Sequence, residues 1–231
     1  MRRLLTLEGR DTGRQVPTDV FIMARGEPAN RAVTKIGGLP FWPTDTPWPH
    51  DPYGCPLIFM AQINLTDSTD ITGPLPGDLL LLFATADCDE IKIIWSSCNG
   101  QSLLVDSVPK TDWTIDPCYG VLYRTVDYPD ITDDIFAAYA QPYLLACLEG
   151  TKIGGVPRWI QDEEQLPGRF LCALSSVQPA FEQPYPFVNI PEPITTFTEL
   201  YGTNDLMIDD MGSYYLFIDN AGQVHITEQC Y

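Results

Sequence analysis

The chain has 231 residues, of which 45% are hydrophobic, 11% aromatic and 19% charged, and its formal net charge at pH 7 is −18. This length and composition are typical of a globular protein and exclude a disordered chain. The negative charge argues against nucleic-acid binding, because affinity for nucleic acids comes largely from Lys and Arg side chains that neutralise phosphates.

The charge is unevenly distributed along the chain. Seven of the 13 basic residues lie in the first 35 residues, whereas residues 36–231 carry six basic and 27 acidic residues. Such a field would steer a basic partner toward the chain, although it would also serve solubility alone. Seven scattered cysteines, the absence of an apolar run of about 18 residues, and an N-terminal apolar patch too short for a signal peptide predict a cytoplasmic protein with reduced thiols and no membrane span.

The first distinctive element is the stretch TKIGGLPFWP at residues 34–43. Lys35 and Ile36 are expected to end a strand, and the two glycines after them permit a positive φ or a close approach of the backbone. Pro40 fixes the next turn, so that Trp42 can fold over the glycines. The aromatic and proline-rich segment 40–54 would be an interaction loop if exposed, and we expect most of it to be buried as a cap on the core.

Short apolar runs with aromatic or β-branched residues predict most of the remaining structure as strands. We expect strands at residues 57–63, 79–84, 91–95, 102–105, 120–126, 169–174, 213–218 and 223–227. Residues 220–222 are expected to form the turn of a terminal hairpin. Helical signals are confined to residues 130–140, with Asp130 as a possible N-cap, and to a single turn at 197–202; Pro142 would stop the first helix or start a second short turn.

A second copy of the first element, TKIGGVPRWI, occupies residues 151–160. Lys152 follows Lys35 by 117 residues, and each copy is followed by an apolar run and then by a strand led by glycine. We interpret this as an internal duplication within one domain of residues 1–231, with repeats of approximately 30–126 and 150–231 joined by a helical segment at 130–149. The predicted fold is mainly β, at the margin of α+β: a duplicated β-rich roll or sandwich with a few short helices.

The motifs KIGGLPFWP, PLIFMAQINL, the second KIGG and the terminal QCY resemble the YwqG-like family, a mostly bacterial domain of unknown function. The resemblance covers roughly residues 20–231. It implies a mostly β fold with an internal duplication and no established enzyme activity, and it suggests an immunity-type role because some relatives lie near toxin genes. The second copy departs from the pattern, since Arg158 replaces an aromatic residue and ALSS at 173–176 replaces Ala-Gln-Ile-Asn, which puts a symmetric pair of ligand sites in doubt.

The repeated motif has two interpretations. The bare amides and the lysine of each copy would hold a carboxylate or phosphate, or each copy would be a turn that packs a tryptophan. Duplication favours the second interpretation, although the backbone does not require the lysine. The residues concerned are Lys35, Gly37, Gly38, Pro40, Trp42, Lys152, Gly154, Gly155, Pro157 and Trp159.

Signatures of catalysis and of metal binding are missing from the sequence. A Cys–His pair would need His50 or His225, and neither lies in a recognisable catalytic motif. The sequence has no metal-ligand spacing of a known type, although DCDE at 87–90 with Cys98 is an acidic cluster. We therefore expect no catalytic residues, no metal and no cofactor.

These observations favour a non-enzymatic acidic binding protein, with an immunity protein that neutralises a basic, toxin-like partner as the best interpretation. The expected partner surface comprises Asp87, Asp89, Glu90, Asp130, Asp133, Asp134, Asp209 and Asp210. Charge complementarity there would speed association and aid specificity. The alternatives are a small-molecule binder or an unrecognised enzyme that uses the Gly-Gly loops, and a structural module without a dedicated ligand.

Overall fold

The structure is a computed structural model, which describes residues 13–99, 103–111, 113–131, 142–177, 187–189 and 204–231. In these parts of the chain the fold is mainly β, as predicted, and a single 11-stranded sheet carries most of the regular structure. The strands are β1 (Val16–Arg25), β2 (Lys35–Ile36), β3 (Ile58–Asn64), β4 (Leu79–Ala84), β5 (Ile91–Ser96), β6 (Cys118–Asp127), β7 (Lys152–Gly154), β8 (Arg169–Ser175), β9 (Phe187–Asn189), β10 (Ser213–Ile218) and β11 (Val224–Gln229). The helical segments are η1 (Thr66–Ser68), α1 (Thr69–Thr72) and α3 (Pro142–Glu149).

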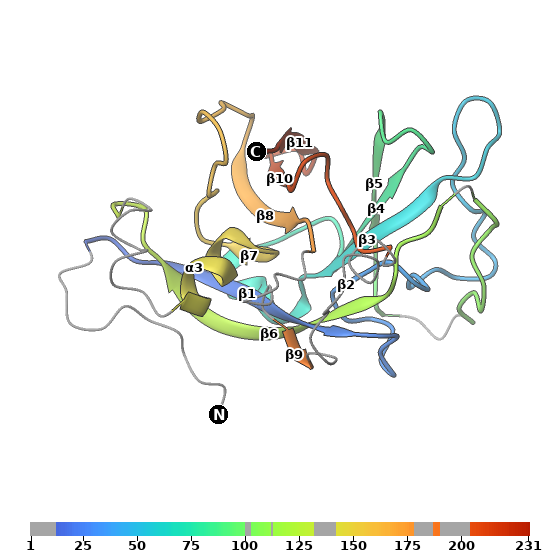
Figure 1. Cartoon of the computed structure of the whole chain (residues 1–231), viewed down its shortest axis with the longest axis horizontal. Helices are drawn as coiled ribbons and strands as arrows, with labels where there is room; N and C mark the ends of the chain where they lie inside the picture. Colours follow the sequence, from blue (N-terminus) through green and yellow to red (C-terminus); the bar gives the residue numbers. More distant parts are fainter. Residues whose placement is uncertain (1–12, 100–102, 112, 132–141, 178–186, 190–203) are drawn as a thin grey trace, which may run out of the picture.

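The order of the strands is symmetric about the central antiparallel pair β1–β6. Outward from β1 the neighbours are β7, β8, β10 and β11, and outward from β6 they are β2, β3, β4 and β5. We call these two series the second arm and the first arm, since each begins with the Lys-Ile pair of the second or the first motif. Figure 1 shows the two arms extending from β1 and β6, with β3, β4 and β5 apart from β8, β10 and β11.

Each central strand pairs with the arm that belongs to the other half of the chain. β1 precedes the first motif in the chain but pairs with β7, where Val20 lies opposite Lys152, whereas β6 precedes the second motif but pairs with β2, where Tyr119 lies opposite Lys35. A ten-residue ladder joins β1 to β6. Each arm therefore depends on a strand from the other half of the chain. In chain order, the first series of elements begins with β1 and the second with β6. The repeat limits of about 30–126 and 150–231 stay a prediction.

Both arms carry a bulge at the same place. The register between β3 and β4 shifts around Met60, and the register between β8 and β10 shifts around Leu171. A bulge bends its strand and increases the local twist. The bulges therefore help each arm to curve over the central pair.

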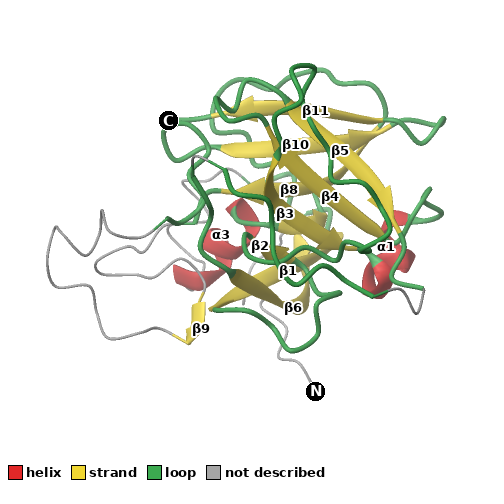
Figure 2. Cartoon of the chain, turned by 90° about the vertical axis from the view of Figure 1, so that its right-hand side faces the viewer, coloured by secondary structure: helices red, strands yellow, loops and turns green. Residues whose placement is uncertain are grey.

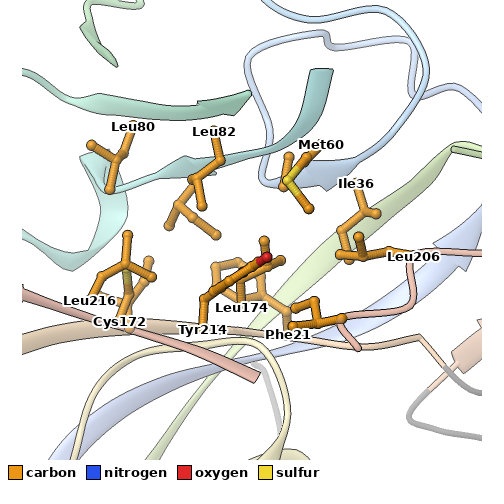
Figure 3. Packing of buried hydrophobic residues seen from close by; sticks show 14 of the residues in the cluster. Phe21, Ile36, Met60, Leu80, Leu82, Cys172, Leu174, Leu206, Tyr214 and Leu216 are labelled. Carbon is orange, nitrogen blue, oxygen red and sulfur yellow. The ribbon is translucent and has the colours of Figure 1, made fainter. Parts of the chain in front are cut away.

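One apolar core is shared by the two arms. Figure 3 shows side chains of the first arm facing side chains of the second across this core: Ile36, Met60, Leu80 and Leu82 with Cys172, Leu174, Tyr214 and Leu216. All of these side chains are buried. Since full burial of a large apolar side chain contributes about 1.5–3 kcal/mol, the shared core binds the arms firmly to each other.

Smaller apolar clusters cover the outer faces of the sheet. Trp42 packs with β3 and β4 on the first arm, and Trp159 packs with β8 and β10 on the second. Leu144, Cys147 and Leu148 of α3 pack on the central pair. Figure 2 shows α1 and α3 on opposite sides of β1 and β6.

Seven of the eight predicted strands match observed strands to within two residues, namely β3, β4, β5, β6, β8, β10 and β11. The predicted strand 102–105 lies partly outside the described residues, and its Leu104 forms an isolated bridge with Pro43. Most of the predicted helix 130–140 and all of the turn 197–202 also lie outside them. The observed helix α3 starts at Pro142, a position that suits proline because the first turn needs no N–H donor there. Within the described parts of the chain, no helix has the length and apolarity to cross a membrane.

Candidate functional site

The first Lys-Ile-Gly-Gly loop closes around a carboxylate of its own chain. The fully buried side chain of Lys35 donates hydrogen bonds from Nζ to the carboxylate of Glu27 and, over 2.9 Å, to the carbonyl oxygen of Leu39. The second oxygen of Glu27 accepts a hydrogen bond of 2.6 Å from the backbone N–H of Leu39. The ammonium group of Lys35 and the backbone amide of Leu39, which follows the two glycines, therefore both bind the carboxylate of Glu27.

The second loop repeats this arrangement around Asp127, the last residue of β6. Lys152 Nζ lies 2.8 Å from Asp127 Oδ2, and the backbone N–H of Val156 donates to the same oxygen over 3.2 Å. Arg158 adds a third donor, which reaches Asp127 Oδ1 over 2.6 Å. Arg158, which departs from the aromatic residue of the first copy, is thus a second counter-charge for a buried carboxylate.

The glycine before each of these amides lies directly beneath the carboxylate. Gly38 has a φ of +64° and Gly155 a φ of +74°, a region that glycine enters without steric cost. A Cβ atom on Gly38 would lie 1.7 Å from Glu27 Oε1, and one on Gly155 would lie 2.9 Å from Asp127 Oδ2. The motif therefore needs glycine both for its backbone conformation and for the close approach of the carboxylate.

The two carboxylates differ in their electrostatic surroundings. Glu27 is 37% exposed, whereas Asp127 is fully buried. Burial by itself would raise the pKa of Asp127, but Lys152 and Arg158 outweigh burial and bring that pKa below its ordinary value. Burial lowers the pKa of both lysines, and each carboxylate opposes that effect.

These contacts bear on the two interpretations of the motif. The donors that would hold an anionic ligand are engaged by Glu27 in the first loop and by Asp127 in the second. The remaining glycine amides are also used: Gly37 N–H donates to Met60 O over 2.7 Å and Gly155 N–H to Pro17 O over 3.0 Å. Chemically, each loop is a carboxylate-binding cradle whose occupant belongs to the chain itself.

The tryptophan of each motif packs against phenylalanines of its own arm. Trp42 is 5% exposed and its ring centroid lies 5.4 Å from that of Phe83. Trp159 lies over Phe217 at 6.0 Å with nearly parallel rings. The prolines lie within the same loops: Pro40 is buried and its carbonyl oxygen accepts the N–H of Trp42, while Pro157 is half-buried. Both tryptophans thus face apolar clusters of the sheet.

Sequence reasoning missed a second symmetric pair of contacts, which links the halves of the chain. Arg25, at the end of β1, forms two hydrogen bonds of 2.6 and 2.8 Å with Asp205, between β8 and β10. Arg124, on β6, forms two of 2.7 and 3.0 Å with Asp70, between β3 and β4. In the β1–β6 ladder, Arg25 lies opposite Cys118 and Arg124 lies opposite Asp19. Each arginine is therefore six residues away from the residue that lies opposite the other arginine. Each arginine therefore ties a central strand to a connection of the opposite half.

Arg124 also neutralises a carboxylate inside the sheet. Asp19, directly opposite Arg124 in the β1–β6 ladder, is fully buried and accepts hydrogen bonds of 2.5 and 2.9 Å from the guanidinium group. Ser68 donates a further hydrogen bond of 2.7 Å to Asp19. Hydrogen bonds to Asp19 and Asp70 raise the pKa of Arg124. An acidic residue within a central strand is thereby satisfied by charge and by hydrogen bonding.

The predicted partner residues fall into separate places. Asp87, Asp89 and Glu90 are exposed in the β4–β5 turn, and Asp209 and Asp210 are exposed before β10. Asp130 is exposed elsewhere and accepts the N–H of Arg14 over 2.9 Å. Asp133 and Asp134 lie outside the described residues.

Glu228 on β11 interacts electrostatically with thiols in or beside two of these acidic turns. Asp87, Asp89 and Glu228 all raise the pKa of the Cys88 thiol, after the larger effect of burial. The thiol of Cys230 donates a hydrogen bond of 3.2 Å to Asp209 Oδ2, which raises the pKa of that thiol, and Glu228 raises it further. Met211 and Tyr231 adjoin this cluster, since the N–H of Tyr231 donates to Asp210 O over 3.1 Å. We call the surface formed by Asp87, Asp89, Asp209, Asp210, Glu228, Met211 and Tyr231 the acidic face.

The two histidines have local partners. His50 Nδ1 lies 2.7 Å from Trp48 O, and His225 Nε2 lies 3.1 Å from Asp219 Oδ2 in the terminal hairpin. Among the residues that the structure describes, no three His, Cys, Asp or Glu side chains converge as metal ligands would. All seven cysteines are free thiols.

A comparison of the sequence with models of known protein families gives a match. The model of a domain of unknown function, DUF1963, matches residues 34–222. The chain belongs to this family. The DUF1963 match begins with the first motif and reaches the turn of the terminal hairpin, so it includes both Lys-Ile-Gly-Gly loops and Asp127. Strand β1 and Glu27 lie before it. None of the curated proteins matches the chain.

Proposed function

We propose that this DUF1963 protein is a non-enzymatic binding protein and that its acidic face receives a basic protein partner. The observation that carries this proposal is the exposure of two acidic turns, at residues 87–90 before β5 and at 209–210 before β10, of which the second is joined to the end of β11 by the hydrogen bond from the Cys230 thiol to Asp209 Oδ2. Attraction between this surface and a basic partner would raise the association rate and select against acidic partners.

Apolar side chains within the acidic face support a protein partner over a small ion. Met211 is 43% exposed and Tyr231 is 72% exposed. Protein interfaces combine charged rims with aromatic residues and methionine at their centre. A basic partner would thus find both charge complementarity and apolar area at one place.

The backbone of the acidic turns gives a second line of support. In the described parts of the chain, the non-glycine residues with positive φ are Cys88, Asp209 and Met211, and all three lie in these turns. Such conformations cost of order 1–3 kcal/mol each and cluster at binding and switch sites. The fold holds these turns in unfavourable conformations, which is consistent with selection for the surface that they present.

The finer identity of the partner rests on the family resemblance. The motifs of this chain resemble the YwqG-like family, in which an immunity-type role is suggested for some members. We therefore propose that the basic partner is a toxin-like protein encoded next to this chain, and that binding occurs in the cytoplasm.

The test is binding between this protein and the product of the adjacent gene. We expect the wild-type chain to retain that product, with an association rate that falls as salt increases. The triple variant Asp87→Asn, Asp89→Asn, Glu228→Gln should associate about tenfold more slowly at low salt, because electrostatic steering contributes 10- to 1,000-fold to such rates. A control with the exposed acids Asp45→Asn and Asp106→Asn, which lie outside the acidic face, should associate almost normally.

Thiol labelling of the complex locates the interface independently. Cys55 and Cys88 are both exposed, and only Cys88 lies between two residues of the acidic face, Asp87 and Asp89. The bound partner should protect Cys88 from a maleimide reagent and leave Cys55 reactive. A neighbour that is not retained, or a complex in which Cys88 stays fully reactive and the triple variant binds normally, would refute the proposed function.

A further inference from the structure

The two Lys-Ile-Gly-Gly loops differ in how accessible their carboxylates are. Asp127 is fully buried at the end of β6, where Lys152 and Arg158 both bind it. The side chain of Glu27 is 37% exposed, forms its ion pair with Lys35, and lies in the connection between β1 and β2, outside regular structure. The first loop can therefore exchange its carboxylate for one from solvent more readily than the second loop can.

A pocket of about 230 Å³ adjoins the first loop at Gly38 and Leu39. A Cβ atom on Gly38 would lie 1.7 Å from Glu27 Oε1 and 2.8 Å from Pro117 Cβ, and Pro117 lines the pocket. The carboxylate of Glu27 and the wall of the pocket therefore meet beside this glycine. Much of the remaining lining is apolar or aromatic: Trp48, Leu57, Phe59, Val108, Pro109 and Ile115. The volume is below the usual range for ligand pockets, so the pocket suits a group the size of one aromatic ring.

Two cations near this pocket depend on the carboxylate of Glu27. Lys35 is fully buried, so burial lowers its pKa, and Glu27 opposes that effect. Arg31 donates to the carbonyl oxygen of Val105 over 2.5 Å and to that of Pro40, and its Nε is buried without a hydrogen-bond partner in the described parts of the chain. Burial lowers the pKa of Arg31 as well, and the charge of Glu27 again opposes it. The place of Glu27 is therefore a site for an anion, whichever molecule supplies that anion.

The pocket also limits the charge that a ligand can carry. Asp116 belongs to its lining, and the Oδ2 atom of this residue accepts a hydrogen bond of 3.1 Å from the N–H of Asn204. An acidic residue at this position disfavours a second negative charge in the pocket. A ligand that fits both the loop and the pocket therefore has one carboxylate and is otherwise neutral and apolar.

We propose that the first loop binds a small carboxylic acid with an apolar body. The carboxylate of the ligand takes the place of Glu27 on Lys35 Nζ and on the N–H of Leu39, and the apolar body enters the pocket. Exchange of one carboxylate for another on the same donors is nearly balanced, because Glu27 gains the hydration that the ligand loses. Burial of the apolar body then supplies the net affinity, and Glu27 acts as an internal competitor. This site lies apart from the acidic face and does not require the basic partner.

Phenylacetate tests the site, with phenylacetamide as its neutral counterpart and acetate as the head group alone, in a buffer without other carboxylates. We expect calorimetric titration to show that the wild-type chain binds phenylacetate at least tenfold more tightly than either of the other two. Glu27→Ala removes the internal competitor, so it should bind phenylacetate at least tenfold more tightly than the wild type does. The unfolding temperature of Glu27→Ala should also rise as phenylacetate is added, because the ligand binds the folded state. The control Glu163→Ala removes an equal charge from an exposed loop and should bind like the wild type.

Val108→Trp tests the pocket in a chain that keeps Glu27, so the proposal can be judged even if Glu27→Ala does not fold. This variant should weaken phenylacetate at least tenfold by obstructing the pocket, and thermal unfolding shows whether its fold is retained. Phenylacetamide that binds as tightly as phenylacetate, or normal binding by Val108→Trp, overturns the proposal. Equal affinity in the wild type and Glu27→Ala overturns it as well, and so does binding by Glu27→Ala alone, which would show that Glu27 keeps ligands out of the native loop. The proposed function is tested separately, through Asp87, Asp89 and Glu228.

Discussion

Lys152 Nζ lies 2.8 Å from Asp127 Oδ2, and each of these side chains has at most 1% of its surface exposed. The pair joins the second Lys-Ile-Gly-Gly loop to the end of β6, and its counterpart, Lys35 with Glu27, joins the first loop to the segment after β1. In each half of the chain, a strand of the central pair is thus fastened to the loop that follows it.

Removing the buried carboxylate should be more harmful than removing its partly exposed counterpart. Asp127 accepts hydrogen bonds from two cations and from the amide of Val156, whereas Glu27 serves one cation and one amide. Breaking a buried ion pair by removing one partner costs about 3–5 kcal/mol, so we expect a loss in that range for Asp127→Asn. Glu27→Gln should cost less, about 1.5–3 kcal/mol. Urea unfolding measures both, and an equal or larger loss for Glu27→Gln would contradict this ranking.

The lowered pKa of Asp127 predicts an acid limit to stability. A carboxyl group with a lower pKa in the folded state than in the unfolded state contributes its full stabilisation above the unfolded value, near pH 4. That contribution is lost as the pH falls through the folded pKa, because the unfolded chain binds the proton more tightly. We expect the free energy of unfolding of the wild type to decline below about pH 4. In Asp127→Asn the slope of the unfolding free energy against pH should be shallower, by an amount that corresponds to the uptake of up to one proton. The same slope in both proteins would disprove the assignment.

A substitution at Gly38 separates backbone strain from contact with the carboxylate. Gly38→Ala forces a side chain into a positive φ, which costs about 1–2 kcal/mol, and it also places a Cβ against Glu27. In a chain that already carries Glu27→Ala, the contact with the carboxylate is gone, while the strain and the close approach of 2.8 Å to Pro117 Cβ remain. The two substitutions should therefore be non-additive, with Gly38→Ala more costly in the wild type than in the Glu27→Ala background. Chemical denaturation of the four proteins of this cycle provides the test, and full additivity would show that the close approach has no energetic role.

Much of the sheet could be predicted from the sequence, because seven strands are short apolar runs bounded by turn residues. β1 escaped prediction because Pro17 and Asp19 are unusual inside a strand. Asp19 is tolerated because Arg124, 105 residues away in the sequence, lies opposite it and Ser68 donates a further hydrogen bond. A contact between distant residues of this kind leaves no periodic signal in the sequence.

The internal partners of the lysines were unpredictable for the same reason. Glu27 precedes Lys35 by eight residues, whereas Asp127 precedes Lys152 by 25, so no common spacing indicates the pairing. The alignment of the two apolar runs also differs from the structure by one position. The runs align on Ala61 and Ala173, but in the sheet Gln62 lies opposite Lys35 where Ala173 lies opposite Lys152. Gln62 donates to Arg31 O and Val33 O, contacts that an alanine at the matching position cannot make.

The bidentate ion pair between Arg25 and Asp205 should couple the two halves of the chain energetically. Both side chains are largely buried, and the hydrogen bonds raise the pKa of Arg25, which shows that its charged form is favoured. We expect Arg25→Met and Asp205→Asn each to destabilise the fold, and their double-mutant cycle to give a coupling free energy within the range of 0.5–3 kcal/mol found for residues in contact. Arg25→Lys should recover only part of the loss, because an ammonium cannot form the paired hydrogen bonds of a guanidinium.

Comparison with Arg124 makes this prediction more demanding. Arg124→Met removes the partner of Asp70, which is exposed, and also that of Asp19, which is fully buried. We expect Arg124→Met to cost more than Arg25→Met, and most of the excess to disappear when Asp19→Asn is added, because the uncompensated buried charge is then gone. Chemical denaturation with a constant m-value across the series would attribute the changes to the folded state. Two outcomes would show that the symmetric bridges do not hold the two halves of the chain together. One is that Arg25→Met and Asp205→Asn are additive, and the other is that Asp19→Asn leaves the loss caused by Arg124→Met unchanged.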